Sequence, residues 1–266
     1  MGKHSSKVAL ITGAAGDIGS AVAKKLYEEG AILALVDIDE DRLENVVYVL
    51  REQFPLQGVI KSFVCDIKDY SDVIKMNDSV LQTFGTIDLL FNNAGYQGLF
   101  MPTYLYPADD FKKVIMINLI GAFHVLQVVS ETMKRNKGGL IVNTASMAGV
   151  AYPPNMVAYS ASKAGVIGLT GATALDLAPY NIRVNSISPA FMGPGNMWDR
   201  QVELQAKANS QYYSLNPDIV AEEMVRAIPM RRLGSMEEIA SVVSFLLSED
   251  SSYLTGVNIP ISGGIR

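Results

Sequence analysis

Residues 7–19 read KVALITGAAGDIG, and this stretch decides the fold. Residues 7–12 are a short apolar run that ends at Gly13, which is typical of a buried parallel strand. A glycine-rich turn leads to Gly19, and residues 20–29 have the pattern of an amphipathic helix. Strand, glycine turn and helix in this order let backbone N–H groups bind a dinucleotide pyrophosphate. The stretch therefore predicts the first unit of a Rossmann-type sheet.

The same alternation of strand and helix continues along the whole chain. Strands are expected at residues 7–12, 32–36, 59–64, 87–91, 140–144, 182–188 and 257–261. Helices are expected at residues 20–29, 39–53, 70–84, 108–135, 157–177 and 237–247. This order predicts an α/β fold with a single doubly wound parallel sheet of about seven strands and helices on both faces. We expect one domain over residues 1–266, with an irregular or loosely helical insertion at about 189–230 that covers the substrate.

Composition excludes several classes of protein. The 266 residues and 49% hydrophobic content suit one α/β domain with a large core. The net charge of −5, without a basic block, argues against a nucleic-acid partner. One cysteine, Cys65, and two histidines cannot form a disulfide within the chain or a Cys/His zinc cluster, and we expect no metal. Since we see neither a signal peptide nor a run of 18 apolar residues, we expect a cytoplasmic protein without membrane contact.

Polar and small residues follow the expected strands, where a doubly wound sheet binds its ligands. The backbone of the glycine turn should hold a pyrophosphate, and Asp66 should meet an adenine edge or, alternatively, cap a helix. The asparagine stretch at residues 92–95 should let a ligand approach, or else only stabilise a turn. The cofactor contacts that we predict are Gly13, Asp17, Ile18, Gly19, Asp37, Ile38, Asp66, Ile67, Asn93, Ala94, Gly95, Tyr159, Lys163, Pro189 and Met192.

Asp37 at the end of the second strand bears on the choice of cofactor. A carboxylate there can accept hydrogen bonds from both adenosine ribose hydroxyls and would repel a 2′-phosphate. The glycine turn contains no Arg or Lys, and Ile38 follows the carboxylate. Arg42 is close in sequence, but we expect it on the solvated face of a helix. These observations favour NAD over NADP.

Tyr159 and Lys163 are four residues apart, which places them one turn apart on one helix face. A tyrosine in water has a pKa near ~10, and a positive charge a few ångströms away lowers that pKa. The pair is therefore a candidate acid/base device. The spacing by itself is a weak signal, because it also fits a half-buried tyrosine beside a solvated lysine.

Several motifs together resemble the short-chain dehydrogenase/reductase superfamily over essentially the whole length. They are Thr12, Gly13 and Gly19, the stretch Asn92, Asn93, Ala94 and Gly95, then Asn118, Ser146, Tyr159 and Lys163. Within the superfamily, residues 91–98 (FNNAGYQG) and 192–205 (MGPGNMWDRQVELQ) are most similar to bacterial NAD-dependent xylitol dehydrogenases. The resemblance implies hydride transfer between NAD and a secondary alcohol, a sugar alcohol such as xylitol, to give a ketone of the D-xylulose type.

The resemblance also implies roles for four residues. Tyr159 removes or returns the hydroxyl proton, and Lys163 lowers the tyrosine pKa and binds the nicotinamide ribose. Ser146 orients the substrate oxygen, and Asn118 holds a water that links Lys163 to solvent. Further substrate contacts are expected from Gln97, Asn155 and Trp198.

Two positions depart from the family pattern. Position 17 carries Asp where the turn usually has Gly, and Pro189 is followed by Ala190 where the family has Pro-Gly. A carboxylate that pointed at the pyrophosphate would repel it, so we predict that Asp17 turns away and caps a helix start.

Other readings stay open. The chain could be a carbonyl reductase for a bulkier or cyclic ketone, or an NAD-binding regulatory protein without turnover. Residues 108–135 and 157–177 have apolar side chains on more than one face. In this superfamily such helices pair across a two-fold axis, which implies a homotetramer, although burial within one monomer explains part of the pattern.

Overall fold

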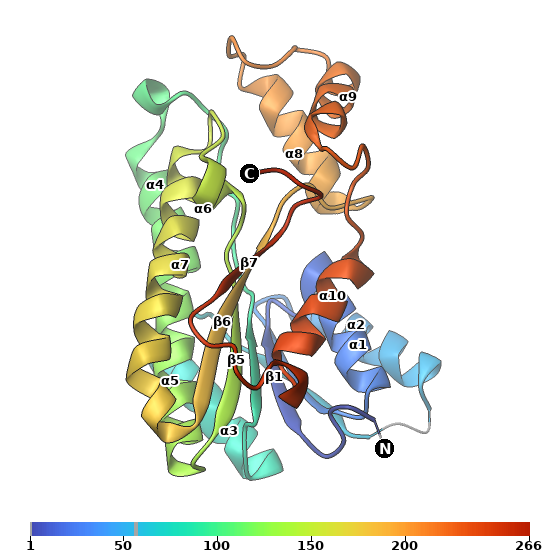
Figure 1. The fold of residues 1–266 in the computed structure, drawn as a ribbon, viewed down its shortest axis with the longest axis vertical. Helices are drawn as coiled ribbons and strands as arrows, with labels where there is room; N and C mark the ends of the chain where they lie inside the picture. Colours follow the sequence, from blue (N-terminus) through green and yellow to red (C-terminus); the bar gives the residue numbers. More distant parts are fainter. Residues whose placement is uncertain (1, 56–57) are drawn as a thin grey trace.

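The computed structural model describes residues 2–55 and 58–266. Its centre is one sheet in the order β3-β2-β1-β4-β5-β6-β7, with all neighbouring strands parallel (Figure 1). The strands are β1 (Val8–Thr12), β2 (Ile32–Asp37), β3 (Ile60–Val64), β4 (Leu89–Asn92), β5 (Gly139–Thr144), β6 (Ile182–Pro189) and β7 (Asn258–Ile261). The expected doubly wound parallel sheet is confirmed.

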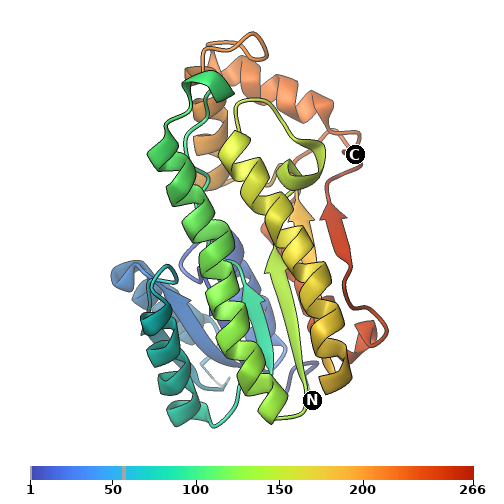
Figure 2. The ribbon, with the colours of Figure 1, turned by 90° about the vertical axis from the view of Figure 1, so that its left-hand side faces the viewer.

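Helices cover both faces of the sheet (Figures 1 and 2). One face carries α3 (Tyr70–Phe84), α4 (Ala108–Ile115), α5 (Ala122–Arg135) and α7 (Val157–Leu177). The other carries α1 (Asp17–Glu28), α2 (Glu40–Gln53) and α10 (Met236–Leu246). Shorter elements are α6 (Ala148–Ala151) and 3-10 turns at Thr103–Leu105, Ala178–Tyr180 and Glu249–Ser251.

The core has two layers because strand side chains alternate between the two faces of the sheet. On β2, Leu33 and Leu35 belong to the cluster on the side of α1, α2 and α10. Ala34 and Val36 of the same strand belong to the cluster on the side of α3, α5 and α7. Both layers are fully buried at these positions, which explains why the strands read as continuous apolar runs rather than as alternating ones.

The long helix expected at residues 108–135 is interrupted by a π-helical segment, Met116–Gly121, which contains Asn118. Such segments are frequent at functional sites. By length and composition, Ala108–Arg135 is long and apolar enough to cross a membrane, since an 18-residue window of it has a mean hydropathy of 1.6. A core helix passes the same test, and here Val125 and Val129 are buried against the sheet.

Residues 189–230 contain two regular helices, α8 (Asn196–Lys207) and α9 (Pro217–Ala227), at the carboxyl end of the sheet (Figure 1). The expectation of an irregular or loosely helical segment was wrong here. Trp198, Val202 and Ala206 recur every four residues and form an apolar stripe on α8. This stripe packs with Val220 and Met224 of α9 in a separate small cluster. We call α8 and α9 the lid.

Candidate active site

A cleft of about 690 Å³ lies beyond the carboxyl ends of β1 to β5, with α7 and the start of α8 on its walls. Its volume is in the range of about 300–1,000 Å³ that small-molecule and cofactor sites have. The switch point of the sheet lies between β1 and β4, where such folds bind ligands. The predicted site residues that line the cleft are Gly13, Asp17, Ile18, Asp37, Ile38, Asp66, Ile67, Asn93, Ala94, Gly95, Gln97, Tyr159 and Lys163.

The glycine turn after β1 is packed tightly against the loop after β4. Gly13 has φ of +64°, and a Cβ at this position would lie 2.8 Å from the Cα of Ala94. Gly19 packs beneath the turn against the Gly13 carbonyl, and it is not among the residues that line the cleft. The N-cap residue of α1 is Gly16, and within the described residues no side-chain cap is seen there. The first N–H groups of α1 can therefore bind an anion such as a pyrophosphate.

Asp37 is fixed at the end of β2 by backbone N–H groups. Its Oδ2 accepts from Ala15 at 2.9 Å, and its Oδ1 accepts from Ile38 at 2.8 Å. The side chain of Arg42 folds back over the glycine turn, where its Nη2 donates to the Ala15 carbonyl at 2.9 Å. Arg42 is also one of the residues that line the cleft. Arg42 is exposed on α2, as expected, but its long side chain also reaches back to a carbonyl of the turn, a contact that was not predicted.

The part of the cleft that follows β3 contains Asp66 and Ile67. Asp66 pairs with Lys68, whose Nζ lies 3.1 Å from Oδ2. Ile67 is buried, and its carbonyl accepts from the His124 ring at 3.1 Å. Helix α3 is capped by Asp69 and not by Asp66, so the alternative role that we considered for Asp66 is not seen.

The asparagine stretch after β4 braces the sheet as well as lining the cleft. Asn93 donates to the carbonyls of Thr12 at 3.2 Å and Gly13 at 3.3 Å, and it accepts from Thr144 at 3.1 Å. Asn92 donates to Asn143 at 3.1 Å, below the cleft. The stretch therefore stabilises its own turn and also lines the cleft, and the approach of a ligand to it stays a prediction. The partners of Asn93 were not predicted, because Thr12 and Gly13 contribute main-chain carbonyls and Thr144 is the last residue of the apolar strand β5.

Tyr159 and Lys163 lie one turn apart on α7, as their spacing predicts. Lys163 is buried, and its Nζ donates to the main-chain carbonyl of Thr144 at 2.7 Å. The same Nζ lies 5.7 Å from the centroid of the Tyr159 ring. Ser146, which follows β5, lies beside Tyr159, and its Oγ accepts a hydrogen bond from the Ala148 N–H at 3.1 Å. The fold thus brings Ser146, Tyr159 and Lys163 together, with Lys163 held by the strand that Ser146 follows.

Burial dominates the protonation equilibria of this group. It raises the pKa of the Tyr159 phenol to about 12, and the neighbouring Ser146 hydroxyl acts in the opposite direction. It lowers the pKa of the Lys163 ammonium to about 8. The expected lowering of the Tyr159 pKa by Lys163 is not seen, because loss of solvent penalises the phenolate more strongly. A second positive charge beside the phenol, such as an oxidised nicotinamide carries, would oppose that penalty.

Asn118 is buried in the π-helical segment. Its Oδ1 accepts from the backbone N–H of Tyr96 at 2.7 Å, and its Nδ2 donates to the Tyr96 carbonyl at 2.9 Å. The same Nδ2 donates to Ser162 at 3.0 Å. The side chain therefore joins the loop after β4 to α7. That Asn118 holds a water linked to Lys163 stays a prediction.

Besides Gly19, Asn118 and Ser146, four predicted site residues are not among those that line the cleft. Asn155 donates to Gln205 and to Ser210, both at 2.9 Å, and so fastens the lid. Trp198 is buried inside the lid, with its ring 5.9 Å from that of Phe191. Pro189 is buried at the end of β6, where its carbonyl accepts from Met147 at 3.0 Å. Met192, the fourth, is paired with Gly234.

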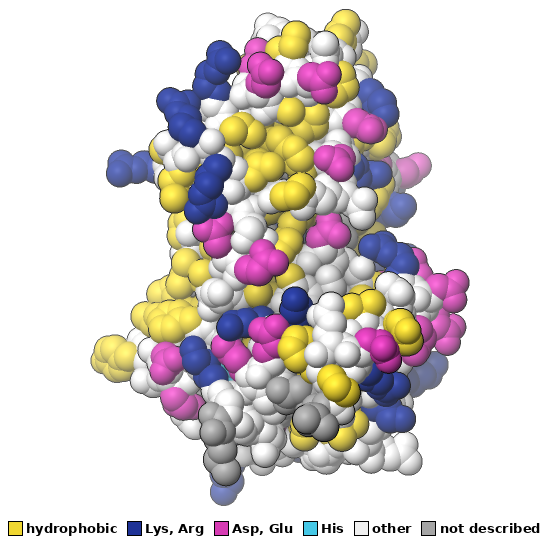
Figure 3. Space-filling model, turned by 90° about the vertical axis from the view of Figure 1, so that its right-hand side faces the viewer, with side chains coloured by type: hydrophobic (Ala, Val, Ile, Leu, Met, Phe, Trp, Pro, Cys, Tyr) yellow, Lys and Arg dark blue, Asp and Glu magenta, His cyan; other side chains and the backbone are white. Residues whose placement is uncertain are grey.

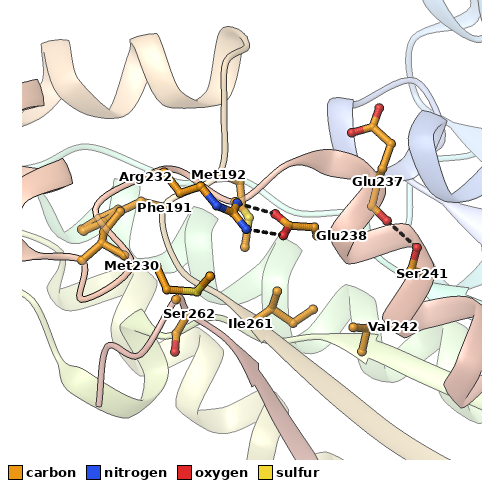
Figure 4. Close-up of a pocket in the computed structure, with 13 residues that line it drawn as sticks. Phe191, Met192, Met230, Arg232, Glu237, Glu238, Ser241, Val242, Ile261 and Ser262 are labelled. Atoms are coloured by element: carbon orange, nitrogen blue, oxygen red, sulfur yellow. Dashed lines mark hydrogen bonds and ion pairs between the residues drawn. The ribbon is translucent and has the colours of Figure 1, made fainter.

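Met192 lines a second cavity, of about 470 Å³, between α10, β7 and residues 228–234. Figure 4 shows Arg232 facing Glu238 there, and Nη2 lies 2.7 Å from Oε1. This arginine lowers the pKa of Glu238 to about 2. The cavity is separate from the group around Tyr159.

Figure 3 shows the side of the molecule that carries α10. Hydrophobic side chains gather in its upper half, and charged side chains flank them.

The lid and α4 contribute cleft residues that the sequence analysis missed. They are Asn196, Met197 and Arg200 of α8 and Lys113 of α4. The apolar stripe through Trp198 was the available signal, because it identifies one face of α8 as core. The opposite face of α8, with residues 197, 200 and 201, therefore faces the cleft.

The amino-acid sequence matches one family model along almost its whole length. The model is described as enoyl-(acyl carrier protein) reductase and matches residues 13–266. The chain belongs to the short-chain dehydrogenase/reductase family. The match spans the glycine turn, Ser146, Tyr159 and Lys163, so this short-chain dehydrogenase/reductase is an oxidoreductase.

Similar proteins of this family act on different alcohols and ketones. The structure of NAD⁺-bound xylitol dehydrogenase is 56% identical, with a TM-score of 0.96, and the match covers 98% of this chain and 100% of that one. Levodione reductase of Leifsonia aquatica is 39% identical over 98% of this chain and 95% of its own. NAD-dependent glycerol dehydrogenase of Listeria innocua is 36% identical over 97% of this chain and 93% of its own.

The cleft of this short-chain dehydrogenase/reductase fits a nicotinamide dinucleotide. A Cβ on Gly95 would come within 3.6 Å of the Lys163 Nζ, so the glycine keeps the backbone close to the reacting group. The uncapped start of α1 suits the pyrophosphate, and the carboxylate of Asp37 suits the ribose. When bound, the cofactor supplies the hydride acceptor or donor. Tyr159 can exchange a proton with the substrate oxygen, and Ser146 can orient that oxygen.

Proposed function

We propose that this chain oxidises a polyhydroxylated secondary alcohol, such as xylitol, to its ketone, of the D-xylulose type, with NAD. The similarity to NAD⁺-bound xylitol dehydrogenase, at 56% identity over nearly the whole of both chains, carries the proposal. The cofactor is NAD, which the carboxylate of Asp37 also favours.

Amide groups near Tyr159 support a hydroxyl-rich substrate. Gln97 lines the cleft, and its Nε2 donates to Oε1 of Gln201 on the lid at 3.3 Å. An amide pair offers both donors and acceptors, which is what the hydroxyls of a polyol need. A polyol that bridged the two amides would replace one hydrogen bond by several.

A second candidate is the reduction of a cyclic ketone, which the similarity to levodione reductase favours. The two candidates are separated by kcat/KM for NAD-dependent turnover of pentitols, hexitols, glycerol and cyclic alcohols. The first candidate requires a pentitol to be the best substrate, and the second requires a cyclic alcohol to be. Tight NAD binding with no turnover of any of them would instead favour a regulatory protein. The grouping of Tyr159 with Lys163, whose Nζ lies 5.7 Å from the tyrosine ring, argues against that reading.

Replacing Asp37 by Asn should lower the ratio of kcat/KM with NAD to that with NADP by about tenfold or more. The substitution removes the charge that repels a 2′-phosphate and one acceptor for the ribose, and a hydrogen bond to a charged group contributes ~1.5–3 kcal/mol. Asp39→Asn is the matched control, since Asp39 caps α2 and is not a lining residue. An unchanged ratio in Asp37→Asn would show that the carboxylate does not select the cofactor.

We further propose a homotetramer in which α5 and α7 pair with other copies. A Cβ on Gly168 or Gly171 of α7 would meet no atom within 4 Å, and Leu175 is 79% exposed. Each glycine costs ~1 kcal/mol relative to alanine inside a helix, which close helix pairing would offset. Light scattering should give four chains for the wild type and fewer for Leu175→Arg. A monomeric wild type would contradict the tetramer.

We infer a location in the cytoplasm. Cys65 is the single cysteine, and its thiol is buried. Burial raises the thiol pKa to about 12, so it is held as the unreactive thiol. A chain of this kind needs no oxidising compartment. Fractionation of cells that express the protein would test the location, and enrichment in a membrane or secreted fraction would contradict it.

A further inference from the structure

The carboxylate of Asp17 contacts the lid. Asp17 is the first residue of α1, but its side chain does not cap that helix. Its Oδ2 instead accepts a hydrogen bond from the backbone N–H of Met197, the second residue of α8, at 3.3 Å. The prediction that Asp17 caps a helix start is therefore met on a different helix, 180 residues further along the chain.

The start of α8 cannot cap itself. The residue before it is Gly195, with φ of +152° and no side chain, and a Cβ there would lie 3.3 Å from Oδ2 of Asp17. An N-cap side chain normally accepts from the second or third N–H of its helix, and Met197 is the second residue of α8. Asp17 thus caps α8, whose own N-cap residue, Gly195, has no side chain that could accept this hydrogen bond.

Two other contacts fasten the same face of α8. Gln201 accepts from Gln97 at 3.3 Å, and Gln205 accepts from Asn155 at 2.9 Å. Residues 197, 201 and 205 are one helical turn apart, so one face of α8 is joined to three loops of the sheet domain. Of these three contacts, the one to Asp17 alone uses a charged group. It is also the one that starts from the glycine turn, where the cofactor pyrophosphate is expected.

We propose that Asp17 is a positioning residue that couples the cofactor-binding turn to the lid. Its negative charge has two opposed effects. It stabilises the start of α8, where helix N–H groups favour an anion, and it weakens the binding of a pyrophosphate at the start of α1. A glycine, the usual residue of the family at this position, can do neither. The proposal rests on NAD binding in the cleft and not on the identity of the alcohol.

Two substitutions separate the effects. Asp17→Gly removes both the acceptor and the charge, and Asp17→Asn keeps an acceptor without the charge. In hydrogen–deuterium exchange of the protein without NAD, Asp17→Gly should speed exchange of residues 196–201 by about fivefold, the effect of losing one N-cap. It should also raise the alcohol KM more than it lowers kcat. Asp17→Asn should keep exchange near that of the wild type and bind NAD more tightly in a titration.

Asp69→Gly is the matched control. Asp69 caps α3 through the backbone N–H of Ser71 at 2.8 Å and is not a lining residue of the cleft. Its loss should leave the exchange of residues 196–201 and the alcohol KM unchanged. Wild-type exchange in Asp17→Gly, or the same increase in Asp69→Gly, would overturn the proposal. Because the exchange experiment contains no alcohol, this failure is distinct from a failure of the polyol assignment.

Discussion

Replacing Tyr159 by Phe should lower kcat for alcohol oxidation by about a thousandfold and leave the NAD dissociation constant nearly unchanged. The substitution removes the hydroxyl that lies beside Ser146 and leaves the ring in place. Positioned acid/base groups contribute about 10²–10⁴-fold to rates, and the middle of this range is expected because an alcohol (Ser146) and a buried ammonium (Lys163) remain near the reacting oxygen. Stopped-flow turnover and a separate NAD titration measure the two quantities.

The control for this substitution is Tyr27→Phe. Tyr27 is a buried tyrosine on α1, on the face of the sheet opposite α7, and its hydroxyl donates to the Gly58 carbonyl at 2.7 Å. Its loss should reduce stability by ~1 kcal/mol, the typical net contribution of one hydrogen bond, without changing kcat. A Tyr159→Phe variant that keeps most of its turnover would remove Tyr159 from the mechanism.

Replacing Lys163 by Met should reduce kcat for oxidation by about a hundredfold and move its pH dependence to higher pH. Oxidation needs the phenolate of Tyr159, and the pKa of that phenol is already raised to about 12 by burial. The Lys163 ammonium, 5.7 Å from the ring centroid, can stabilise the phenolate as it forms in the reaction, and the substitution takes that stabilisation away. Ketone reduction uses the protonated phenol and should be less sensitive. Met keeps an unbranched side chain in the space of the lysine stem.

The pH profile of kcat for oxidation, measured with saturating NAD, tests this. In the wild type, activity should rise with pH and then flatten or fall above about 8, where the Lys163 ammonium loses its proton according to its lowered pKa. Lys134→Met is the control, because Lys134 also lies over a tyrosine ring, that of Tyr180 at 4.4 Å, on the outer surface. A Lys163→Met profile that coincides with the wild-type profile would exclude the proposed electrostatic role.

Most of the fold could be predicted from the sequence because burial on both faces of a parallel sheet leaves long apolar runs. The helix at residues 157–177 begins and ends where expected, while the strand expected at 87–91 is Leu89–Asn92. The lid was not foreseen as regular helices. Helix α8 has only a narrow apolar stripe, and this stripe packs on α9 rather than on the sheet. Its pattern is therefore recognisable only when the partner helix is known.

The cofactor end of the site was predictable because the carboxyl ends of parallel strands meet at one edge of the sheet. Asp37, Asp66 and Asn93 line one cleft for that reason. The contacts from Asp17 and Arg42 were not predictable, because they depend on where long side chains fold back after the chain has packed. The high pKa of Tyr159 was missed for a similar reason, since sequence reveals a neighbouring charge but not the depth of burial.

The measurement that tests the central claim most directly uses xylitol deuterated on its secondary carbinol carbons, with the wild-type protein and NAD. The proposed reaction predicts a ketone and NADH that carries the deuterium, formed more slowly than from unlabelled xylitol. No NADH from a protein that binds NAD, or NADH without the label, would contradict direct transfer from a polyol carbon in this cleft.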